Sequence, residues 1–171
     1  MSDIKIRFAE IKDTPQLADM LCKFHDYFNA QLGDNLDPLP DRETLESDIM
    51  RLHFSDNPML QTLIAQSADG RAVGRLSFYR GWASSWYLRF HLSGIFVPDE
   101  FRGQGIADKL FERLIEIAKE EKAKKIVWNL WRPNKKARKF YERMGGEYLA
   151  KGSPSEGDAN DDLVMQYRVR K

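Results

Sequence analysis

The stretch from Arg102 to Ala107 has the residue types of an anion-binding loop. It reads Arg-Gly-Gln-Gly-Ile-Ala and directly precedes a segment with helical periodicity. The first turn of a helix has N–H groups without intrahelical partners and a partial positive charge, so it attracts anions. Glycine has no β-carbon, so a phosphate can approach the backbone closely at these positions. We therefore predict a phosphate site formed by the backbone N–H groups of Gly103, Gln104, Gly105, Ile106 and Ala107.

Two well-known phosphate motifs do not fit this loop. A nucleoside triphosphate loop reads GxxxxGK followed by Ser or Thr, and no lysine follows Gly103 or Gly105 at the required place. A dinucleotide loop reads GxGxxG, and here Asp108 stands where the third glycine is needed. A nucleoside triphosphate is therefore excluded as the ligand, and a dinucleotide is poorly supported.

The same loop, together with a second stretch, resembles the GNAT superfamily of N-acetyltransferases. Arg-x-x-Gly-x-Ala after Val-Pro-x-x-Phe is similar to the acetyl-CoA loop of that family. The later stretch WNLWRPNKKARKFYERMGG matches the family's second signature, N-x-x-A-x-x-F-Y-x-x-x-G, at Asn134, Ala137, Phe140, Tyr141 and Gly145. The two signatures and the segment between them span about residues 91–149. The resemblance implies acetyl-CoA as cofactor, with its pyrophosphate on the loop amides.

The resemblance also implies roles for individual residues around the cofactor. The backbone of Ile95, Phe96 and Val97 would hold the pantetheine and the acetyl carbonyl, while Arg102 and Asn134 would contact the cofactor. Tyr141 matches the family's general acid beside the sulfur. Proton transfer from an ordinary tyrosine to a thiolate is uphill by about 2 kcal/mol, so we favour a hydrogen bond to sulfur. Asn134 directly before a helix also has the simpler interpretation of an N-cap.

The acceptor amine must lose a proton before it can attack. An alkylammonium is neutral in about one molecule in 2,500 at pH 7, a deficit of about 4.6 kcal/mol. The chain looks nearest to the diamine and thialysine acetyltransferase branch, which carries Leu-Glu-Asp-Leu-Tyr-Val where this chain has Leu-Ser-Gly-Ile-Phe-Val at residues 92–97. Both carboxylates are absent, so polyamine specificity is in doubt. The base remains open between a water relay and the candidates Asp26, Asp34, Asp37 and His91.

Three functional classes stay open on these grounds. We favour an acetyl-CoA-dependent N-acetyltransferase acting on a primary amine of a small molecule. A protein or peptide N-acetyltransferase and a non-catalytic acyl-CoA-binding module are the alternatives. The aromatic side chains of Tyr79, Trp82, Trp86 and Tyr87 could line an acceptor cleft or form a dimer contact, and we lean toward a homodimer.

Composition limits the other classes of partner. The 171 residues fit a single domain, 1–171, and 27 basic against 26 acidic residues give no argument for nucleic acid or an anionic membrane. One cysteine allows no intramolecular disulfide, and the three histidines show no metal-ligand spacing. No apolar run approaches the roughly 18 residues of a membrane span. We expect a soluble cytoplasmic protein without a metal.

The elements that position these residues follow from hydrophobic periodicity and turn residues. We predict an α/β fold in the order β-α-α-β-β-β-α-β-α-β-β, with helices flanking a mixed central sheet as the resemblance implies. Thr14 is the expected N-cap of the first helix, and Asp41 that of the second. Residues 33–40 and 151–162 are expected to be loops. The strands are expected at residues 4–8, 60–65, 72–79, 86–97, 126–131, 148–149 and 163–169, and the later helices from residue 106 and over 134–145.

Overall fold

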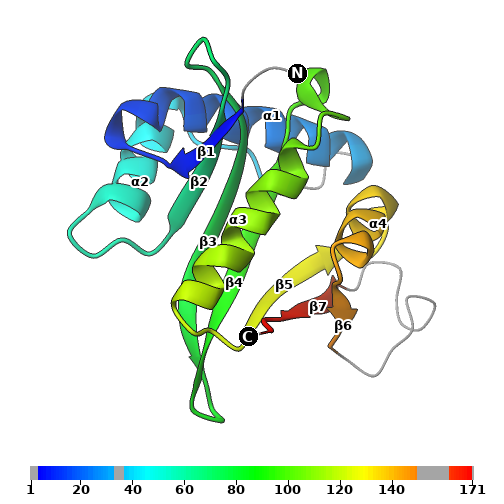
Figure 1. Cartoon of the computed structure of the whole chain (residues 1–171). Coiled ribbons are helices and arrows are strands. Elements are labelled where there is room, and N and C mark those ends of the chain that lie inside the picture. The colour runs from blue at the N-terminus through cyan, green and yellow to red at the C-terminus, as the bar shows by residue number, and fades with distance from the viewer. Residues whose placement is uncertain (1–3, 33–36, 150–161, 171) are drawn as a thin grey trace. The chain divides into compact units, whose positions relative to one another are not determined.

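The α/β fold expected from the sequence is confirmed by the computed structural model, which describes residues 4–32, 37–149 and 162–170 (Figure 1). Within these residues the strands are hydrogen-bonded as one mixed sheet in the order β1-β2-β3-β4-β5-β7-β6. The helices are α1 (Thr14–Leu32), α2 (Arg42–Phe54), α3 (Ile106–Glu120) and α4 (Lys135–Arg143). The strands are β1 (Lys5–Phe8), β2 (Gln61–Gln66), β3 (Ala72–Ala83), β4 (Tyr87–Phe96), β5 (Lys125–Trp131), β6 (Glu147–Tyr148) and β7 (Asp162–Arg168).

The chain forms two compact units, and β3, β4 and α3 each pass from one to the other. The first unit comprises Met1–Ser77 and Ile95–Phe111, and the second comprises Phe78–Gly94 and Glu112–Lys171. The predicted phosphate loop belongs to the first unit. Tyr141 and Asn134 belong to the second.

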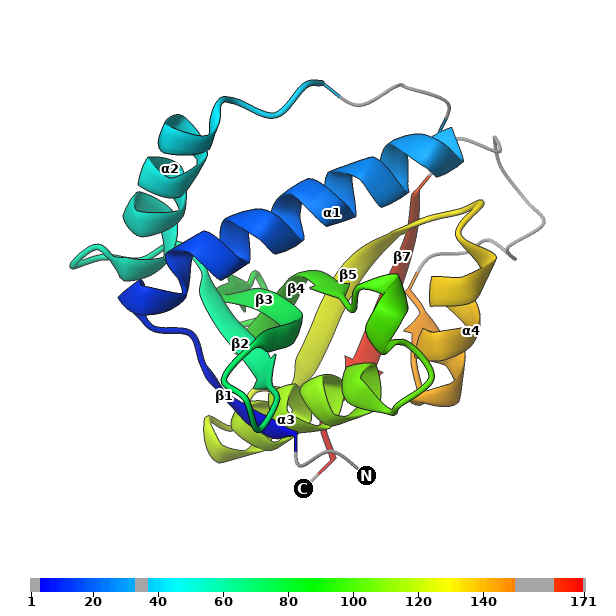
Figure 2. The same cartoon turned by 90° about the horizontal axis from the view of Figure 1, so that it is seen from above.

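In the first unit, α1 and α2 pack on strand β2. β1 pairs antiparallel with β2, and a buried apolar cluster joins the helices to the strand. That cluster consists of Leu17, Ala18, Leu45, Ile49 and Ile64. The start of α3 lies on the other side of β3 from α1 (Figure 2), because Gly74 leaves space for Ile106 and Leu110: a β-carbon on Gly74 would lie 2.9 Å from Ile106 Cγ2.

The beginning of α1 differs from the prediction. Thr14 is the first residue of α1 and not its N-cap, because a short 3₁₀ turn, Ile11–Asp13, precedes the helix. The Thr14 hydroxyl donates to the Ile11 carbonyl at 2.7 Å. Asp13 accepts from the Glu10 backbone N–H at 2.7 Å and pairs with Arg7, whose Nη1 lies 2.8 Å from Asp13 Oδ2. The Asp13 and Glu10 side chains therefore form the capping box of the 3₁₀ turn, which leads directly into α1.

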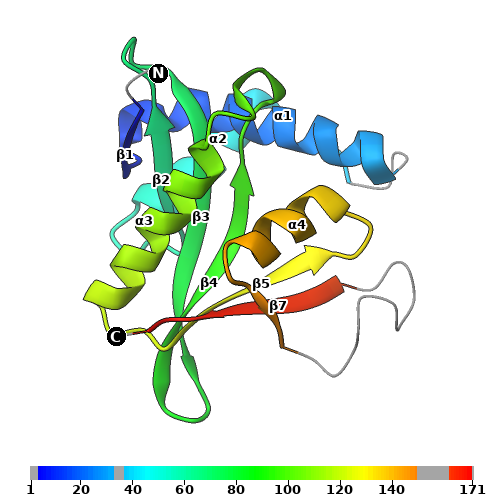
Figure 3. The same cartoon turned by 45° about the vertical axis from the view of Figure 1, so that its right-hand side comes forward.

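In the second unit, α4 lies alongside β5 and β7 (Figure 3). β4 and β5 are parallel, with Phe90 opposite Ile126, and β7 is antiparallel to both β5 and β6. Gly146 follows α4 at a point where a β-carbon would lie 2.8 Å from the Tyr141 carbonyl oxygen and 3.0 Å from the Trp128 ring. Only glycine fits there, so the chain can turn tightly from α4 into β6.

The β3–β4 hairpin is longer than the sequence indicated. β3 extends to Ala83, four residues beyond the predicted end at Tyr79. At the predicted end of β3, stacked ring pairs join the two strands: Phe78 on Phe90 with centroids 5.2 Å apart, and Tyr79 on His91 at 4.7 Å. The hairpin turn carries Trp86 with a φ of 62°.

Other expectations concern the loops and the absence of metal and membrane sites. Among the described residues, no helix is long and apolar enough to cross a membrane, and no group of three or more His, Cys, Asp or Glu side chains could hold a metal ion. Most of the loop expected at residues 151–162, and half of the loop at residues 33–40, lie outside the described residues.

Candidate functional site

The glycine loop has the backbone conformation that only glycine adopts easily. Gly103 and Gly105 have φ values of 76° and 71°, in the left-handed region. A β-carbon on Gly103 would meet no atom within 4 Å, and one on Gly105 would meet only Asp108 Oδ2 at 3.8 Å. The loop face is therefore open, and α3 begins directly after it at Ile106. N–H groups of the first helical turn can be reached from this face.

Arg102 fixes this loop to the end of β4. Its Nε donates to the Val97 carbonyl at 2.9 Å, and Nη1 lies 2.5 Å from Asp99 Oδ1. Its guanidinium carbon also lies 4.4 Å from the centroid of the Tyr27 ring. These contacts restrain the guanidinium, so Arg102 sets the shape of the loop in addition to contributing positive charge near it.

Aromatic side chains of α1 hold the end of β4 in the first unit. The Phe96 ring lies 5.6 Å from the Phe24 centroid and 6.3 Å from that of Tyr27. Phe96 and Val97 are buried, and Ile95 is half-buried. The structure thus brings the predicted residues of the β4 end together with Arg102 and the glycine loop.

Tyr141 is buried on α4 in the second unit. Its ring centroid lies 4.6 Å from that of Trp128 and 5.0 Å from that of Phe140. Burial raises the pKa of Tyr141 well above its ordinary value. The phenol therefore stays protonated at neutral pH and can donate a hydrogen bond. It is also a weaker acid than the phenol of an exposed tyrosine.

Asn134 caps α4 as the sequence predicted. Its Oδ1 accepts from the Ala137 N–H at 3.0 Å. One of the unpaired amides at the start of the helix is therefore satisfied by this side chain. Asp41 acts in the same way on α2, with Thr44 N–H donating to Oδ1 at 3.0 Å.

The candidate bases are dispersed. Asp26 is 83% exposed, and its Oδ1 lies 3.9 Å from His25 Nδ1. Asp37 is exposed, and its backbone carbonyl accepts from His25 Nε2 at 2.9 Å. Asp34 lies outside the described residues. Both described aspartates are thus exposed to solvent.

His91 lies in a cavity of about 420 Å³ in the second unit. Ser93 and Asn129 also line this cavity, and Tyr79 stacks on the imidazole. Burial and then the positive charge of Arg89 lower the pKa of His91. The imidazole is therefore neutral at pH 7, which is the form that can accept a proton.

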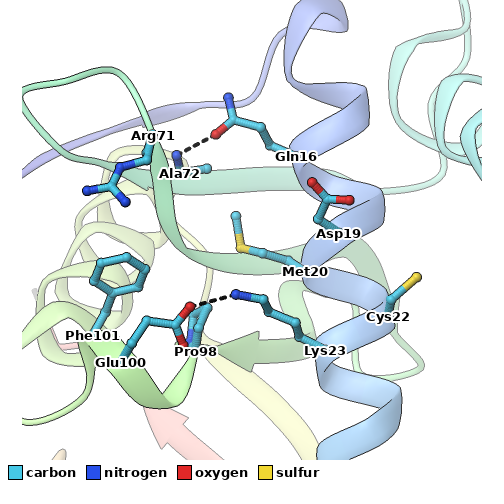
Figure 4. A pocket seen from close by; sticks show the side chains of 10 residues that line it. All are labelled: Gln16, Asp19, Met20, Cys22, Lys23, Arg71, Ala72, Pro98, Glu100 and Phe101. Carbon is cyan, nitrogen blue, oxygen red and sulfur yellow. Dashed lines mark hydrogen bonds and ion pairs between the residues drawn. The ribbon is translucent and has the colours of Figure 1, made fainter.

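A second cavity, of about 400 Å³, lies in the first unit between α1, the start of β3 and the turn after β4 (Figure 4). Lys23 Nζ and Glu100 Oε1 meet at 2.6 Å, and Gln16 accepts from the Ala72 N–H at 2.7 Å. The Cys22 side chain points away from the other lining residues (Figure 4). The charges of the Lys23–Glu100 pair compensate each other, and both side chains are half-exposed, so this cavity has no evident reactive group.

The sequence analysis missed a chain of buried polar groups in the first unit. Arg75 Nη1 lies 3.4 Å from Ser77 Oγ, which lies 2.7 Å from Thr62 Oγ1. Thr62 Oγ1 lies 3.0 Å from His53 Nδ1. Burial and then the charge of Arg75 lower the pKa of His53 to about 4. These residues come from α2, β2 and β3, so no local pattern in the sequence groups them.

The structure is that of an α/β protein with a glycine loop directly before a helix, and the comparisons with known proteins identify the family. The model of the acetyltransferase (GNAT) family matches residues 22–146. That match covers well over half of the chain, so the protein belongs to the acetyltransferase (GNAT) family and is an acyltransferase.

Individual relatives support the resemblance to the thialysine branch. The chain is 26% identical over 177 residues to the thialysine N-epsilon-acetyltransferase of Sus scrofa, covering 96% of this chain and 99% of the relative. Among solved structures it resembles an acetyltransferase of the GNAT family from Staphylococcus aureus Mu50, with a TM-score of 0.72, 16% identity and coverage of 98% and 100% of the two chains. It also resembles the PaiA N-acetyltransferase of Thermoplasma acidophilum in complex with coenzyme A, with a TM-score of 0.68, 18% identity and coverage of 97% and 99%.

Proposed function

We propose that this protein transfers the acetyl group of acetyl-CoA to a primary amine of a small molecule. The observation that carries the proposal is the pair of left-handed glycines, Gly103 and Gly105, on the open face directly before α3. The relative from Sus scrofa that matches nearly the whole chain is named a thialysine N-epsilon-acetyltransferase, which supports a small-molecule acceptor. The proposal treats residues 1–171 as one catalytic domain.

The residues of the loop fit a diphosphate. The amides of Gly103, Gln104, Gly105, Ile106 and Ala107 are the proposed donors. A helix start and a loop without β-carbons both favour an anion there. Arg102 adds positive charge while its Nε keeps the Val97 carbonyl in place. Backbone groups of Ile95, Phe96 and Val97 are proposed to bind the pantetheine and the acetyl carbonyl, and Asn134 is proposed to contact the cofactor as well as capping α4.

Acetyl-CoA supplies an electrophilic thioester carbonyl, and the chain must stabilise the charges that develop when an amine attacks it. A backbone N–H at the end of β4 is the proposed donor to the oxyanion. Tyr141 is the proposed donor to the sulfur. Because burial raises the pKa of Tyr141, full proton transfer costs more than for an ordinary tyrosine. We therefore assign Tyr141 a hydrogen bond to the leaving thiolate.

In this chain the amine must lose its proton to a group other than the two carboxylates of the diamine branch. Ser93 and Gly94 occupy the positions of those acids. His91 is the proposed base, directly or through water, because its lowered pKa keeps the imidazole neutral.

The exposed aromatic residues of the β3–β4 hairpin support a homodimer as part of the proposal. Trp82 and Trp86 are 68% and 87% exposed, and their ring centroids lie 6.4 Å apart. Tryptophan is enriched in protein interfaces, where its large apolar area is covered.

A single assay tests the proposal against its alternatives. Purified protein is incubated with acetyl-CoA and a panel of polyamines, amino acids, aminoglycosides and peptides, and free thiol is measured, with Tyr141→Phe run in parallel. Turnover of small amines that is reduced in the variant supports the proposal. Turnover of peptides alone would favour a peptide acetyltransferase. Acetyl-CoA binding without turnover on any amine would favour a binding module and overturn the proposal.

A further inference from the structure

The cavity of about 420 Å³ in the second unit contains a cation and, among the described residues that line it, no carboxylate. Its walls include residues of β3, β4, β5 and β7, which are neighbours in the sheet (Figure 3). Arg89 provides the cation, and its Nε is buried without a hydrogen-bond partner. Within the described part of the chain Arg89 makes no ion pair. Ser93 lines the same cavity and is exposed, so solvent and ligands can reach it.

The charge of Arg89 acts on the other groups in this cavity. His91 follows it by two residues on β4, so both side chains lie on one face of the strand. After burial, the Arg89 charge is the second cause of the lowered pKa of His91. Tyr79 faces the imidazole from β3, and the described lining residues of β5 and β7 include no titratable group. An ammonium group that entered the cavity would be disfavoured by the same charge.

The His91 imidazole is held in place as a proton acceptor. It stacks on Tyr79 with planes inclined by 6°. A β-carbon on Gly81 would lie 3.3 Å from both Cδ2 and Nε2 of the imidazole, so the glycine leaves room for this edge of the ring. Among the described residues the ring nitrogens of His91 make no hydrogen bond, whereas His53 Nδ1 lies 3.0 Å from Thr62 Oγ1. A His91 nitrogen can therefore take a proton from a bound acceptor.

A neutral imidazole is a poor base for an alkylammonium. With ordinary pKa values of about 6.5 and 10.4, proton transfer between them is unfavourable by about 10⁴-fold. The lowered pKa of His91 widens this gap. An aromatic amine avoids it, because the nitrogen lone pair is delocalised into the ring and the amine is uncharged at pH 7. Its nitrogen becomes acidic only when it attacks, so the weak base of this cavity matches a weakly basic amine.

The walls of the cavity also suit an aromatic ring. Val127, Val164 and Leu149 contribute apolar surface. Trp128 lines the cavity, and its ring centroid lies 4.6 Å from that of Tyr141, the proposed donor to the sulfur. A guanidinium attracts the face of an aromatic ring. An aromatic acceptor would thus gain from the same cation that disfavours an ammonium.

We propose that this cavity binds an aromatic primary amine, an aniline type of molecule, in its uncharged form, and that Arg89 selects it against alkylamines. This inference rests on the proposed function, whose acceptor it names. The new C–N bond forms as the C–S bond of the thioester breaks, and the sulfur keeps the bonding electrons while Tyr141 donates a hydrogen bond to it. The amine loses one proton to His91, which releases it to solvent, and the thiolate takes one from solvent. Ser93 stands where the diamine branch has its first carboxylate, so a group that would hold an ammonium is replaced.

The test uses two isomeric acceptors that differ in basicity. 4-Methylaniline and benzylamine contain the same atoms, but only benzylamine is an ammonium at pH 7. Wild-type protein is expected to have the higher kcat/KM on 4-methylaniline. Part of that preference comes from the protonation of benzylamine in solution, so the ratio of the two kcat/KM values is compared between proteins. Arg89→Met should reduce the ratio by about 10-fold, the equivalent of one pKa unit, and Arg89→Lys should retain most of it.

Two further variants sharpen the comparison. Ser93→Glu places a carboxylate in the cavity and should also reduce the ratio by raising kcat/KM for benzylamine. Arg168→Met is the control, because Arg168 is also a strand arginine of the second unit but pairs with Glu147 at 2.9 Å. If Arg89 only supports the fold, Arg89→Met would lower the melting temperature and reduce both kcat/KM values equally. An unchanged ratio in Arg89→Met would overturn the inference.

The acid limb of the pH profile reports on the charge of Arg89 and not on its packing. For 4-methylaniline, kcat/KM should be constant above the pKa of His91 and fall below it, because the base must be unprotonated. In Arg89→Met this limb should move to higher pH, since a positive charge that lowers the pKa of His91 is removed. A limb at the same pH in both proteins would contradict the electrostatic role of Arg89.

Calorimetry separates this inference from the proposed function. If no amine is acetylated, the proposed function fails, and each isomer is titrated into wild-type protein and Arg89→Met saturated with coenzyme A. Tighter binding of 4-methylaniline that is lost in Arg89→Met supports the site without turnover. Equal binding of the two isomers, or none, would overturn it. Conversely, wild-type turnover of benzylamine at or above that of 4-methylaniline would overturn the inference, although the acetyltransferase proposal would stand.

Discussion

The Tyr141 ring packs on the Trp128 ring, with centroids 4.6 Å apart and planes inclined by 34°. This contact packs the Tyr141 phenol, which stays protonated, against a side chain of β5. It also means that the ring and the hydroxyl of Tyr141 have separable roles. The ring contributes to packing, and the hydroxyl is the group to which the proposed hydrogen bond is assigned.

Tyr141→Phe should therefore separate catalysis from folding. Phenylalanine keeps the ring on Trp128, so the melting temperature should change little. Loss of the hydroxyl should lower kcat by about 10- to 100-fold while the affinity for acetyl-CoA is maintained. Steady-state kinetics and thermal unfolding check both parts. Tyr148→Phe is the control, because the Tyr148 hydroxyl instead donates to Glu142 at 2.5 Å. Unchanged kcat in Tyr141→Phe would contradict the role assigned to this hydroxyl.

The pH profile gives a second prediction for Tyr141. Because burial raises its pKa above the ordinary value near 10, the phenol is protonated throughout the range from pH 6 to 10. The kcat of the wild type should show no alkaline decrease from this group below about pH 10. A decrease with a midpoint near pH 9 that disappears in Tyr141→Phe would show that the phenol ionises more easily than its burial implies.

Alanine at Gly103 or Gly105 should weaken acetyl-CoA binding. Both glycines have left-handed φ values, where a β-carbon costs about 1–2 kcal/mol. No protein atom lies within 4 Å of a β-carbon at Gly103, so backbone strain and lost space for the ligand are the expected causes. The Kd for acetyl-CoA, measured by calorimetry, should rise by about tenfold. Gly70→Ala has the same kind of φ, 86°, in a hairpin turn of the first unit. Gly70→Ala should lower stability by a similar amount without changing the Kd for acetyl-CoA. An equal rise in Kd in Gly70→Ala would refute a specific role for the glycine loop.

His53 should make stability depend on mildly acidic pH. Its pKa is about 4 in the folded chain and 6.5 in the unfolded chain, so the unfolded chain binds more protons between these values. The contribution of His53 is complete above pH 6.5 and is lost as the pH falls toward 4. Allowing for its partial exposure, we expect a loss of about 1–2 kcal/mol, measured by urea unfolding at several pH values. His53→Gln should flatten this slope and His25→Gln should not. A slope unaffected by His53→Gln would contradict the prediction.

Trp82→Ala with Trp86→Ala should convert a dimer into a monomer. Both indoles are exposed at the hairpin, so removing them should cost the isolated chain little stability. Molar mass from light scattering checks the prediction, with Met59→Ala as a control because Met59 is also 67% exposed. A double variant that stays dimeric but has a raised KM for the acceptor would favour an acceptor cleft.

The elements with strong local signals could be predicted from the sequence. α3 begins at Ile106 as expected, because a glycine loop and a clear apolar periodicity coincide there. The caps Asp41 and Asn134 were also predicted correctly, since an N-cap depends on one side chain and the amide three residues later. Thr14 is not an N-cap because a 3₁₀ turn, Ile11–Asp13, leads directly into α1.

The rest depends on contacts between distant residues. The sequence predicts that the strand ends at Tyr79, whereas the stacking of Tyr79 on His91 depends on the pairing of β3 with β4. Arg75 resembled an ordinary surface charge in an alternating strand. Its burial follows from the helix that covers it, through Phe24, and not from its neighbours in sequence. Contacts of this kind depend on strand pairing and helix packing, so no local sequence pattern predicts them.

Trp86 has two properties that do not stabilise the fold of an isolated chain. It sits in water, 87% exposed, and its φ of 62° is a conformation that costs a residue with a bulky side chain about 1–2 kcal/mol. A glycine at this turn would relieve the backbone strain of the isolated chain and would lose only the contact with the exposed Trp82 ring. In the proposed homodimer, the strain at the hairpin tip would be offset by the apolar area that the indole buries against the partner.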